Sequence, residues 1–178
     1  MCGIVGLFIK DPALEPQLGR LTARMLETMT GRGPDSAGFA VYGEGADGRT
    51  KITLRGASAE AIRETVSNIE RAFPDASAVL HDTHAVVSIA DEDEHRLDDW
   101  LATESLDTEI VGRGSRMEIF KEVGLPADVA ARFGLATMRG THAIGHTRMA
   151  TESAVTTDGA HPYSTGQDQC LVHNGSLS

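Results

Sequence analysis

The first residues of the chain, CGIVGLFI at positions 2–9, join a cysteine that directly follows the initiator methionine to a short apolar run. The aliphatic residues of this run predict a buried strand that ends before Asp11-Pro12. The small side chain of Cys2 permits removal of Met1, which leaves a thiol and a free α-amine on one residue. Because this amine can accept the thiol proton, Cys2 is a candidate nucleophile that needs no histidine partner. Taken alone, a cysteine at this position is weak evidence for a nucleophile, and a buried or incidental thiol is the more common explanation.

The composition is that of an ordinary globular chain. With 178 residues, 40% of them hydrophobic and 24% charged, it is long enough for one domain with its own core. Its 16 basic and 26 acidic residues give a net charge of −10, which repels phosphate backbones and anionic membranes. Its apolar runs fall short of the roughly 20 residues of a membrane span, and its start lacks the basic segment of a signal peptide. We therefore expect a cytoplasmic protein that binds neither nucleic acid nor membrane, with Cys2 and Cys170 both reduced.

Hydrophobic periodicity predicts both strands and helices along the chain. Helices are expected where apolar residues recur every three to four positions, and strands where short apolar runs are bounded by Gly, Pro or Asp. The predicted helices cover residues 16–31, 59–73, 115–123 and 126–133. The predicted strands cover residues 2–9, 39–42, 51–56, 78–90, 142–151 and 169–175. The glycine-rich turn at 43–48 predicts that the strands on either side of it form a hairpin.

The stretch at about 56–140 is predicted to be largely helical, and it contains the most acidic part of the chain. Between Asp91 and Glu109 lie nine acidic residues and one basic residue, Arg96, so this segment contributes −8 to the net charge. Like charges at this density are most stable in water, which favours a solvated loop or face over an acidic docking surface. We interpret the stretch as a helical, acidic insertion within one domain that spans residues 1–178.

Three further motifs accompany Cys2. Residues 31–38 read GRGPDSAG, residues 145–151 read GHTRMAT, and residues 173–175 read HNG at the end of a predicted strand. Each has an ordinary structural interpretation by itself: a glycine-rich turn, a strand with one exposed arginine, and an Asn-Gly turn. Together with Cys2, and in this order, they resemble the class II glutamine amidotransferases, whose N-terminal-nucleophile (Ntn) glutaminase domain carries motifs of this kind. The resemblance covers about residues 1–42 and 142–178.

This resemblance implies hydrolysis of the side-chain amide of glutamine by the Cys2 thiolate. Attack on an amide places negative charge on its oxygen, so hydrogen-bond donors are needed at that oxygen. By resemblance, these donors are the side-chain NH₂ of Asn174 and the backbone N–H of Gly175. The predicted catalytic residues are therefore Cys2, Asn174 and Gly175.

The resemblance also implies how the substrate is held. Arg148 would bind the α-carboxylate of glutamine through a planar pair of donors that a lysine could not reproduce. Thr151 and Gly175 would add nearby contacts, and Arg32 and Asp35 would shape the loop over the nucleophile. Position 149 is methionine where relatives often carry an aromatic residue, so the pocket wall is expected to differ.

The fold implied by the resemblance is an α+β, four-layer αββα Ntn-hydrolase sandwich. The ammonia would pass to a synthase partner or domain, and the long 56–140 stretch favours the glutaminase subunit of a glutamate synthase-like enzyme, including those that make N-methylglutamate. The family needs an acidic residue after His-Asn-Gly to bind the substrate ammonium. Because the chain ends before one occurs, we expect a domain that is incomplete at its C-terminus.

The sequence predicts neither a cofactor nor a metal site, since it has no glycine-rich phosphate motif and no metal-ligand spacing of His and Cys. His142, His146 and His161 are interpreted as strand and turn residues with hydrogen-bond partners, because the α-amine already supplies a base. Two alternatives remain. One is a catalytically inactive, glutaminase-like subunit with a regulatory or assembly role, and the other is an Ntn amidase that acts on another amide.

Overall fold

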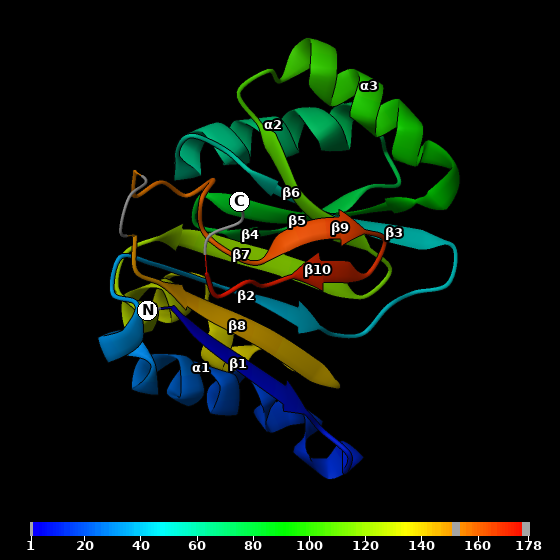
Figure 1. Cartoon of the computed structure of the whole chain (residues 1–178). Helices are drawn as coiled ribbons and strands as arrows, with labels where there is room; N and C mark the ends of the chain where they lie inside the picture. The colour runs from blue at the N-terminus through cyan, green and yellow to red at the C-terminus, as the bar shows by residue number, and fades with distance from the viewer. Residues whose placement is uncertain (1, 151–153, 176–178) are drawn as a thin grey trace.

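The computed structural model describes residues 2–150 and 154–175, which form two four-stranded sheets, a two-stranded sheet and several helices (Figure 1). The first sheet has the order β1–β8–β2–β7 and is antiparallel throughout. Its strands are β1 (Gly3–Phe8), β8 (His142–Arg148), β2 (Ser36–Tyr42) and β7 (Met117–Val123). The second sheet, also antiparallel, has the order β4–β5–β3–β6. Its strands are β4 (Ser77–His81), β5 (His84–Ala90), β3 (Arg49–Arg55) and β6 (Glu109–Gly114).

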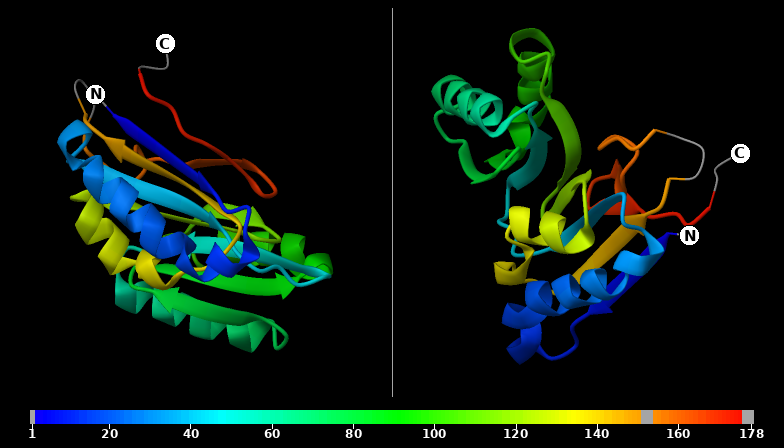
Figure 2. Two further views of the ribbon diagram at one scale, coloured as in Figure 1. Left: turned by 90° about the horizontal axis from the view of Figure 1, so that it is seen from below. Right: turned by 90° about the vertical axis from the view of Figure 1, so that its left-hand side faces the viewer.

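Helices pack against both sheets, which makes this an α+β protein (Figure 2). The α helices are α1 (Leu18–Thr28), α2 (Ala59–Ala72), α3 (Glu94–Glu104) and α4 (Pro126–Arg132). Short 3-10 helices are η1 (Pro12–Gln17), η2 (Thr30–Arg32), η3 (Asp91–Asp93) and η4 (Leu135–Thr137). Buried residues of α1 and α4 share one hydrophobic cluster with the first sheet, and those of α2 and α3 share another with the second sheet.

The alternation of side chains along β2 shows how the layers are stacked. Phe39 and Val41 belong to the cluster that includes α1 and α4, whereas Ala40 and Tyr42 belong to a cluster shared with β6 and β7. Because successive side chains of a strand point to opposite faces, the two faces of the first sheet contact different layers. The prediction of an Ntn sandwich stays a prediction, since a particular family's fold does not follow from layering alone.

Local signals account for the helices that the sequence predicts correctly. The N-cap of α2 is Ser58, whose Oγ accepts a hydrogen bond of 3.1 Å from the Ala61 backbone N–H, and the helix ends before Phe73-Pro74. Its buried residues recur at helical spacing. The helices expected near 16–31 and 126–133 are confirmed as α1 and α4. In the described ranges, no helix combines the length and the apolarity that crossing a membrane requires.

The hairpin predicted around residues 43–48 is wrong. Both strands exist, but β2 lies in the first sheet between β8 and β7, and β3 lies in the second sheet between β5 and β6. Each strand is buried along most of its length and has neighbours on both sides. The six residues at 43–48 therefore connect the two sheets, where a two-residue turn would have forced the strands to pair.

The helix predicted for residues 115–123 is also wrong. Residues 117–123 form β7, which pairs with β2 from Ser36↔Val123 to Tyr42↔Met117. The capping-box spacing of Ser115 and Glu118 was the basis of the prediction. Seven consecutive pairings with a buried strand outweigh that local preference, as tertiary context commonly does.

The stretch 56–140 is not largely helical, because it supplies β4, β5, β6 and β7 as well as α2, α3 and α4. The acidic segment 91–109 is mostly the helix α3, with Leu97 and Leu101 buried against the second sheet. Its acidic residues are partly solvated, as expected, but Glu94 and Asp98 bind Arg113 of β6 at 2.7 and 3.0 Å. Whether the stretch is an insertion stays a prediction.

A two-stranded sheet, β9 (Tyr163–Gly166) and β10 (Gln169–Leu171), leads the chain to the HNG motif. The turn between its strands contains Asp168, which has a φ of 53°. The Asp168 carboxylate accepts hydrogen bonds from the backbone N–H groups of Ser115, Arg116 and Met117, each at 2.9 Å, and from the Ser115 hydroxyl at 2.8 Å. One carboxylate thus joins the β9–β10 turn to the β6–β7 turn.

Candidate active site

Strands β1 and β8 bring the predicted nucleophile and the predicted substrate arginine to the same end of the first sheet. They pair antiparallel with Gly3 opposite Thr147, so Cys2 precedes β1 where Arg148 ends β8. Cys2 is half-buried, and its thiol forms no disulfide. The predicted nucleophile and the predicted carboxylate ligand therefore lie at neighbouring strand ends, although 146 positions separate them in the sequence.

Two further predicted residues meet at the backbone carbonyl oxygen of Cys2. Arg32, at the end of η2, donates from Nε to this oxygen at 3.3 Å, and Asn174 donates from Nδ2 at 3.1 Å. The Asn174 amide therefore lies beside Cys2, the predicted nucleophile. This contact brings together the start of the chain, the GRGPDSAG motif and the HNG motif.

Asp35 of the GRGPDSAG motif holds the segment that carries Arg148. Its carboxylate accepts a hydrogen bond of 2.8 Å from the backbone N–H of Ala150, and its own N–H donates to the Arg148 carbonyl at 3.1 Å. Asp35 was predicted to shape a loop, and the structure shows its contacts with the backbone of Arg148 and Ala150. Thr151, the other predicted substrate ligand in this motif, lies outside the described residues.

A histidine of β8 fixes the HNG motif. His146 is fully buried, and its Nε2 donates to the carbonyl oxygen of His173 at 2.9 Å, directly before Asn174. Gly175 has a φ of 142°, a conformation that side-chain-bearing residues rarely adopt, so glycine is required there. The sequence predicted that His146 would have a hydrogen-bond partner, and this contact confirms it for one of its two nitrogens.

His161 packs on His146, with ring centroids 4.3 Å apart. Within the described part of the chain, neither ring nitrogen of His161 has a hydrogen-bond partner, which contradicts its expected role as a satisfied turn residue. Burial lowers the pKa of His161 to about 4, and burial also lowers the pKa of His146. Both rings are therefore neutral at neutral pH, as expected for a packed pair with cationic neighbours.

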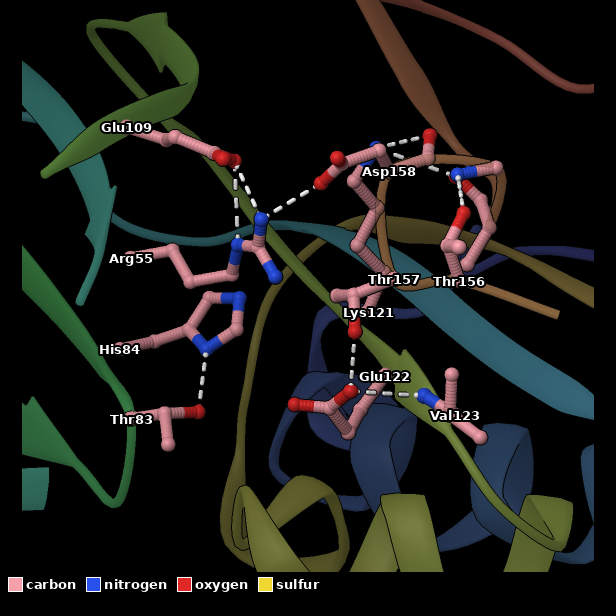
Figure 3. A network of polar contacts seen from close by, with 12 residues as sticks. Arg55, Thr83, His84, Glu109, Lys121, Glu122, Val123, Thr156, Thr157 and Asp158 are labelled. Carbon is pink, nitrogen blue, oxygen red and sulfur yellow. Dashed lines mark hydrogen bonds and ion pairs between the residues drawn. The ribbon is translucent and has the colours of Figure 1, made fainter. Parts of the chain in front are cut away.

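A polar network borders the segment that follows Arg148 (Figure 3). Arg55 of β3 binds both Glu109 of β6 and Asp158, at 2.6 and 2.5 Å. Glu122 of β7 accepts a hydrogen bond from the Thr157 hydroxyl. Beside this network lies a cavity of about 540 Å³, and neither Cys2 nor Arg148 lines it.

Lys121, the residue before Glu122 in β7, points into the same region. Its ammonium group donates to the backbone carbonyl oxygens of Ala160 at 3.1 Å and Asp158 at 3.4 Å. The Lys121 side chain is buried, and burial lowers its pKa. Lys121 was not among the predicted site residues, because it lies in a stretch interpreted as helix. The single lysine of Met117–Val123, which directly follows the apolar pair Ile119-Phe120, is the signal that could have drawn attention to it.

Opposite Lys121, Gly38 closes the GRGPDSAG motif in β2. A Cβ atom on Gly38 would lie 2.2 Å from the carbonyl oxygen of His161 and 2.6 Å from Cβ of Lys121. Since real Cβ atoms do not approach so closely, only glycine allows the chain at 160–161 to lie against the sheet here. Close packing therefore requires glycine as the last residue of the motif, a requirement that cannot be recognised in the sequence alone.

Comparison with known proteins agrees with the motifs. The chain is 56% identical to "Glutamine amidotransferase-like protein GlxB" of Rhizobium meliloti (strain 1021), over the whole of this chain and 60% of the relative. It is 35% identical to "Putative glutamine amidotransferase" of Methanothermobacter thermautotrophicus, again over the whole chain and 62% of the relative.

A shorter similarity links the chain to an aminotransferase. Over 68 residues, 38% of this chain and 11% of the relative, it is 38% identical to "Glutamine--fructose-6-phosphate aminotransferase [isomerizing]" of Streptococcus pyogenes serotype M6. No protein-family model matches the chain. The chain spans about 60% of the length of the first two relatives. Along its whole length it is therefore similar to proteins described as glutamine amidotransferases or as glutamine amidotransferase-like.

Proposed function

We propose that the chain performs the glutaminase half-reaction of a glutamine amidotransferase, with Cys2 as the nucleophile after removal of Met1. The names of the two relatives that match the whole of this chain support glutamine amidotransferase chemistry. The observation that carries the assignment of residues is the meeting of Arg32 and Asn174 at the Cys2 carbonyl oxygen. Motifs that are far apart in the sequence converge on the one residue able to supply both a thiol and its own base.

In the first half of the proposed reaction, the α-amine of Cys2 takes the thiol proton, and the thiolate attacks the side-chain amide carbon of glutamine. The new C–S bond places negative charge on the amide oxygen. Asn174 Nδ2 and the Gly175 N–H donate to that oxygen, and one such donor typically contributes roughly 3–4 kcal/mol to the stability of the transition state. Arg148 holds the α-carboxylate, so that the amide carbon lies at the sulfur.

In the second half, the C–N bond breaks and the α-ammonium returns its proton to the nitrogen, which leaves as ammonia. The remaining thioester is attacked by water, with the same amine as base. Glutamate is released and the thiol is restored. No cofactor is needed in this sequence of steps, because every proton that moves has a donor and an acceptor in Cys2, the substrate or water.

We further propose that the ammonia passes to a glutamate synthase-like partner or domain and that the chain adopts the Ntn-hydrolase sandwich. The fold proposal is supported by helices that pack outside two antiparallel sheets. The partner proposal is supported only by the long stretch between the GRGPDSAG and GHTRMAT motifs. A cytoplasmic location is proposed because both described cysteines are unpaired.

The test is intact-mass analysis of the full-length protein, with and without 6-diazo-5-oxo-L-norleucine, a glutamine-like electrophile. We expect loss of Met1 and one covalent adduct, which peptide mapping places on Cys2. Cys2→Ser abolishes the adduct, and Cys170→Ser, a matched change at the other cysteine, retains it. Ammonia release from L-glutamine follows the same pattern.

Other outcomes would contradict this proposal in distinct ways. A retained Met1 without an adduct would favour the inactive regulatory or assembly subunit. Loss of Met1 without hydrolysis of glutamine, together with hydrolysis of a different amide, would favour an Ntn amidase.

A further inference from the structure

Two residues of the segment Ala154–Ala160, which we name the 154–160 loop, lie against the guanidinium group of Arg148. Arg148 donates from Nη1 to the carbonyl oxygen of Ala154 at 3.3 Å. Gly159 also lies close to the guanidinium group, since a Cβ atom on this glycine would be 3.3 Å from Nη1 and 3.4 Å from Cζ. The position of the guanidinium therefore depends on the conformation of this loop.

The 154–160 loop is attached to both sheets by three side chains. Arg55 binds the Asp158 carboxylate, Glu122 accepts from the Thr157 hydroxyl, and Lys121 donates to the carbonyl oxygens of Asp158 and Ala160 (Figure 3). Two of the three come from adjacent residues of β7.

The three attachments differ in strength. Asp158 is 71% exposed, so its ion pair with Arg55 is largely screened by water and contributes little. Lys121 is 8% exposed, and its charge is stabilised by the two loop carbonyls and by the Tyr163 ring, whose centroid lies 4.7 Å from Nζ. A buried ammonium group is costly unless such partners are fixed in place. Lys121 therefore defines the conformation of the loop more strongly than the Arg55–Asp158 ion pair does.

We propose that Lys121 is a positioning residue for glutamine binding: it fixes the 154–160 loop, and the loop holds the Arg148 guanidinium in place for the α-carboxylate. This inference rests on the proposed function, in which Arg148 is the carboxylate ligand. The effect of Lys121 passes through the backbone of residues 158–160, because its ammonium group donates to the carbonyl oxygens of Asp158 and Ala160.

The test compares two substrates of the full-length protein, L-glutamine and its α-methyl ester, which keeps the side-chain amide but lacks the free carboxylate. Lys121→Met keeps the apolar stem and removes the donors. We expect it to raise KM for L-glutamine roughly tenfold and to leave kcat within about twofold. The KM for the methyl ester changes much less, since the carboxylate contact is absent from the start.

Lys51→Met is the matched control. Lys51 lies in β3, is paired with Glu118 at 2.6 Å and makes no contact with the 154–160 loop among the interactions described. It should leave KM unchanged for both substrates. If Lys121→Met does not fold, Thr157→Val serves instead, because it removes the hydrogen bond by which the loop contacts Glu122. We expect it to raise the KM for L-glutamine by a smaller factor.

The outcomes separate the two ideas. Suppose that the wild-type protein hydrolyses L-glutamine. If Lys121→Met leaves the KM for L-glutamine unchanged, or raises the KM for L-glutamine and for its methyl ester by the same factor, the positioning role is refuted and the proposed function stands. If the wild-type protein does not hydrolyse L-glutamine, the proposed function fails, and this inference fails with it.

Discussion

Replacing Asp168 should remove the hydrogen bonds that join the β9–β10 turn to the β6–β7 turn. The carboxylate accepts four hydrogen bonds, three from consecutive backbone N–H groups at residues 115–117 and one from the Ser115 hydroxyl. Its backbone N–H in turn donates to the Arg113 carbonyl at 3.1 Å. Asp168→Asn retains the side-chain shape and tolerates the positive φ, but it replaces one accepting oxygen by an NH₂ donor.

The magnitude follows from the hydrogen bonds that are lost. A hydrogen bond to a charged group contributes roughly 1.5–3 kcal/mol, but Ser115 and Arg116 are exposed, so water replaces much of what the carboxylate supplied. We therefore expect a loss in the free energy of unfolding of about 1–2 kcal/mol for Asp168→Asn. For Asp168→Ala, which removes every acceptor, we expect about 2–3 kcal/mol.

The effect should depend on pH in a defined direction. Burial raises the pKa of Asp168, but the hydrogen bonds from Arg116, Ser115 and Met117 outweigh it, so the folded-state pKa lies below its ordinary value. The folded state thus binds fewer protons than the unfolded state near that value. The stabilisation by Asp168 is complete above the unfolded pKa of about 3.9 and is lost as the pH falls through the folded pKa.

Urea unfolding measured by circular dichroism checks this prediction. The difference in the free energy of unfolding between the wild-type protein and Asp168→Asn should be constant from about pH 8 to pH 5. It should become smaller at lower pH. Asp107→Asn, which changes an exposed carboxylate in the loop before β6, serves as the control and should change stability little. A difference below about 0.5 kcal/mol at pH 7, or one that widens as the pH falls, would refute the reasoning.

Two further predictions concern the site and the core. Asn174→Ala should lower kcat for glutamine hydrolysis, measured as ammonia release, by roughly 10²–10³-fold. Cys2 should still react with iodoacetamide in this variant. An unchanged kcat would show that Asn174 is not an oxyanion donor. Burial, with cationic neighbours, lowers the pKa of His84 to about 3, so the wild-type protein should lose stability as the pH falls from about 6.5 towards 3, by up to about 1.4 kcal/mol per pH unit. His84→Gln should flatten this dependence in urea unfolding, and an unchanged slope would show that other groups cause it.

The fold was predictable where the signal was local. The helix α2 begins at a serine cap and ends before a proline, and both residues can be recognised in the sequence. The membership of a strand in one sheet or the other has no local signal. The strands β2 and β3 follow each other directly, yet each pairs with residues at least 29 positions further along the chain. The sequence of the linker at 43–48 does not indicate these pairings.

The candidate site followed the same division. Its motif residues Cys2, Arg32 and Asn174 were predicted by resemblance and lie together, and Asp35, also predicted, contacts the segment that follows Arg148. Lys121 was missed, because its importance comes from burial and from two backbone carbonyls that only the folded chain brings to it. A residue that acts through another segment's backbone leaves no motif of its own.

The contact between Cys2 and Asn174 also bears on the order in which the molecule can mature. Ribosomes add roughly 5–20 residues per second, so about 10–30 s separate the synthesis of Cys2 from that of the amide that reaches its carbonyl oxygen. The strand β1 must also wait, because its neighbour in the sheet is β8. In the proposed mechanism, a nascent chain would expose Cys2 to methionine-removing enzymes well before the proposed catalytic residues are assembled, and glutamine hydrolysis would begin only after the two distant segments have met.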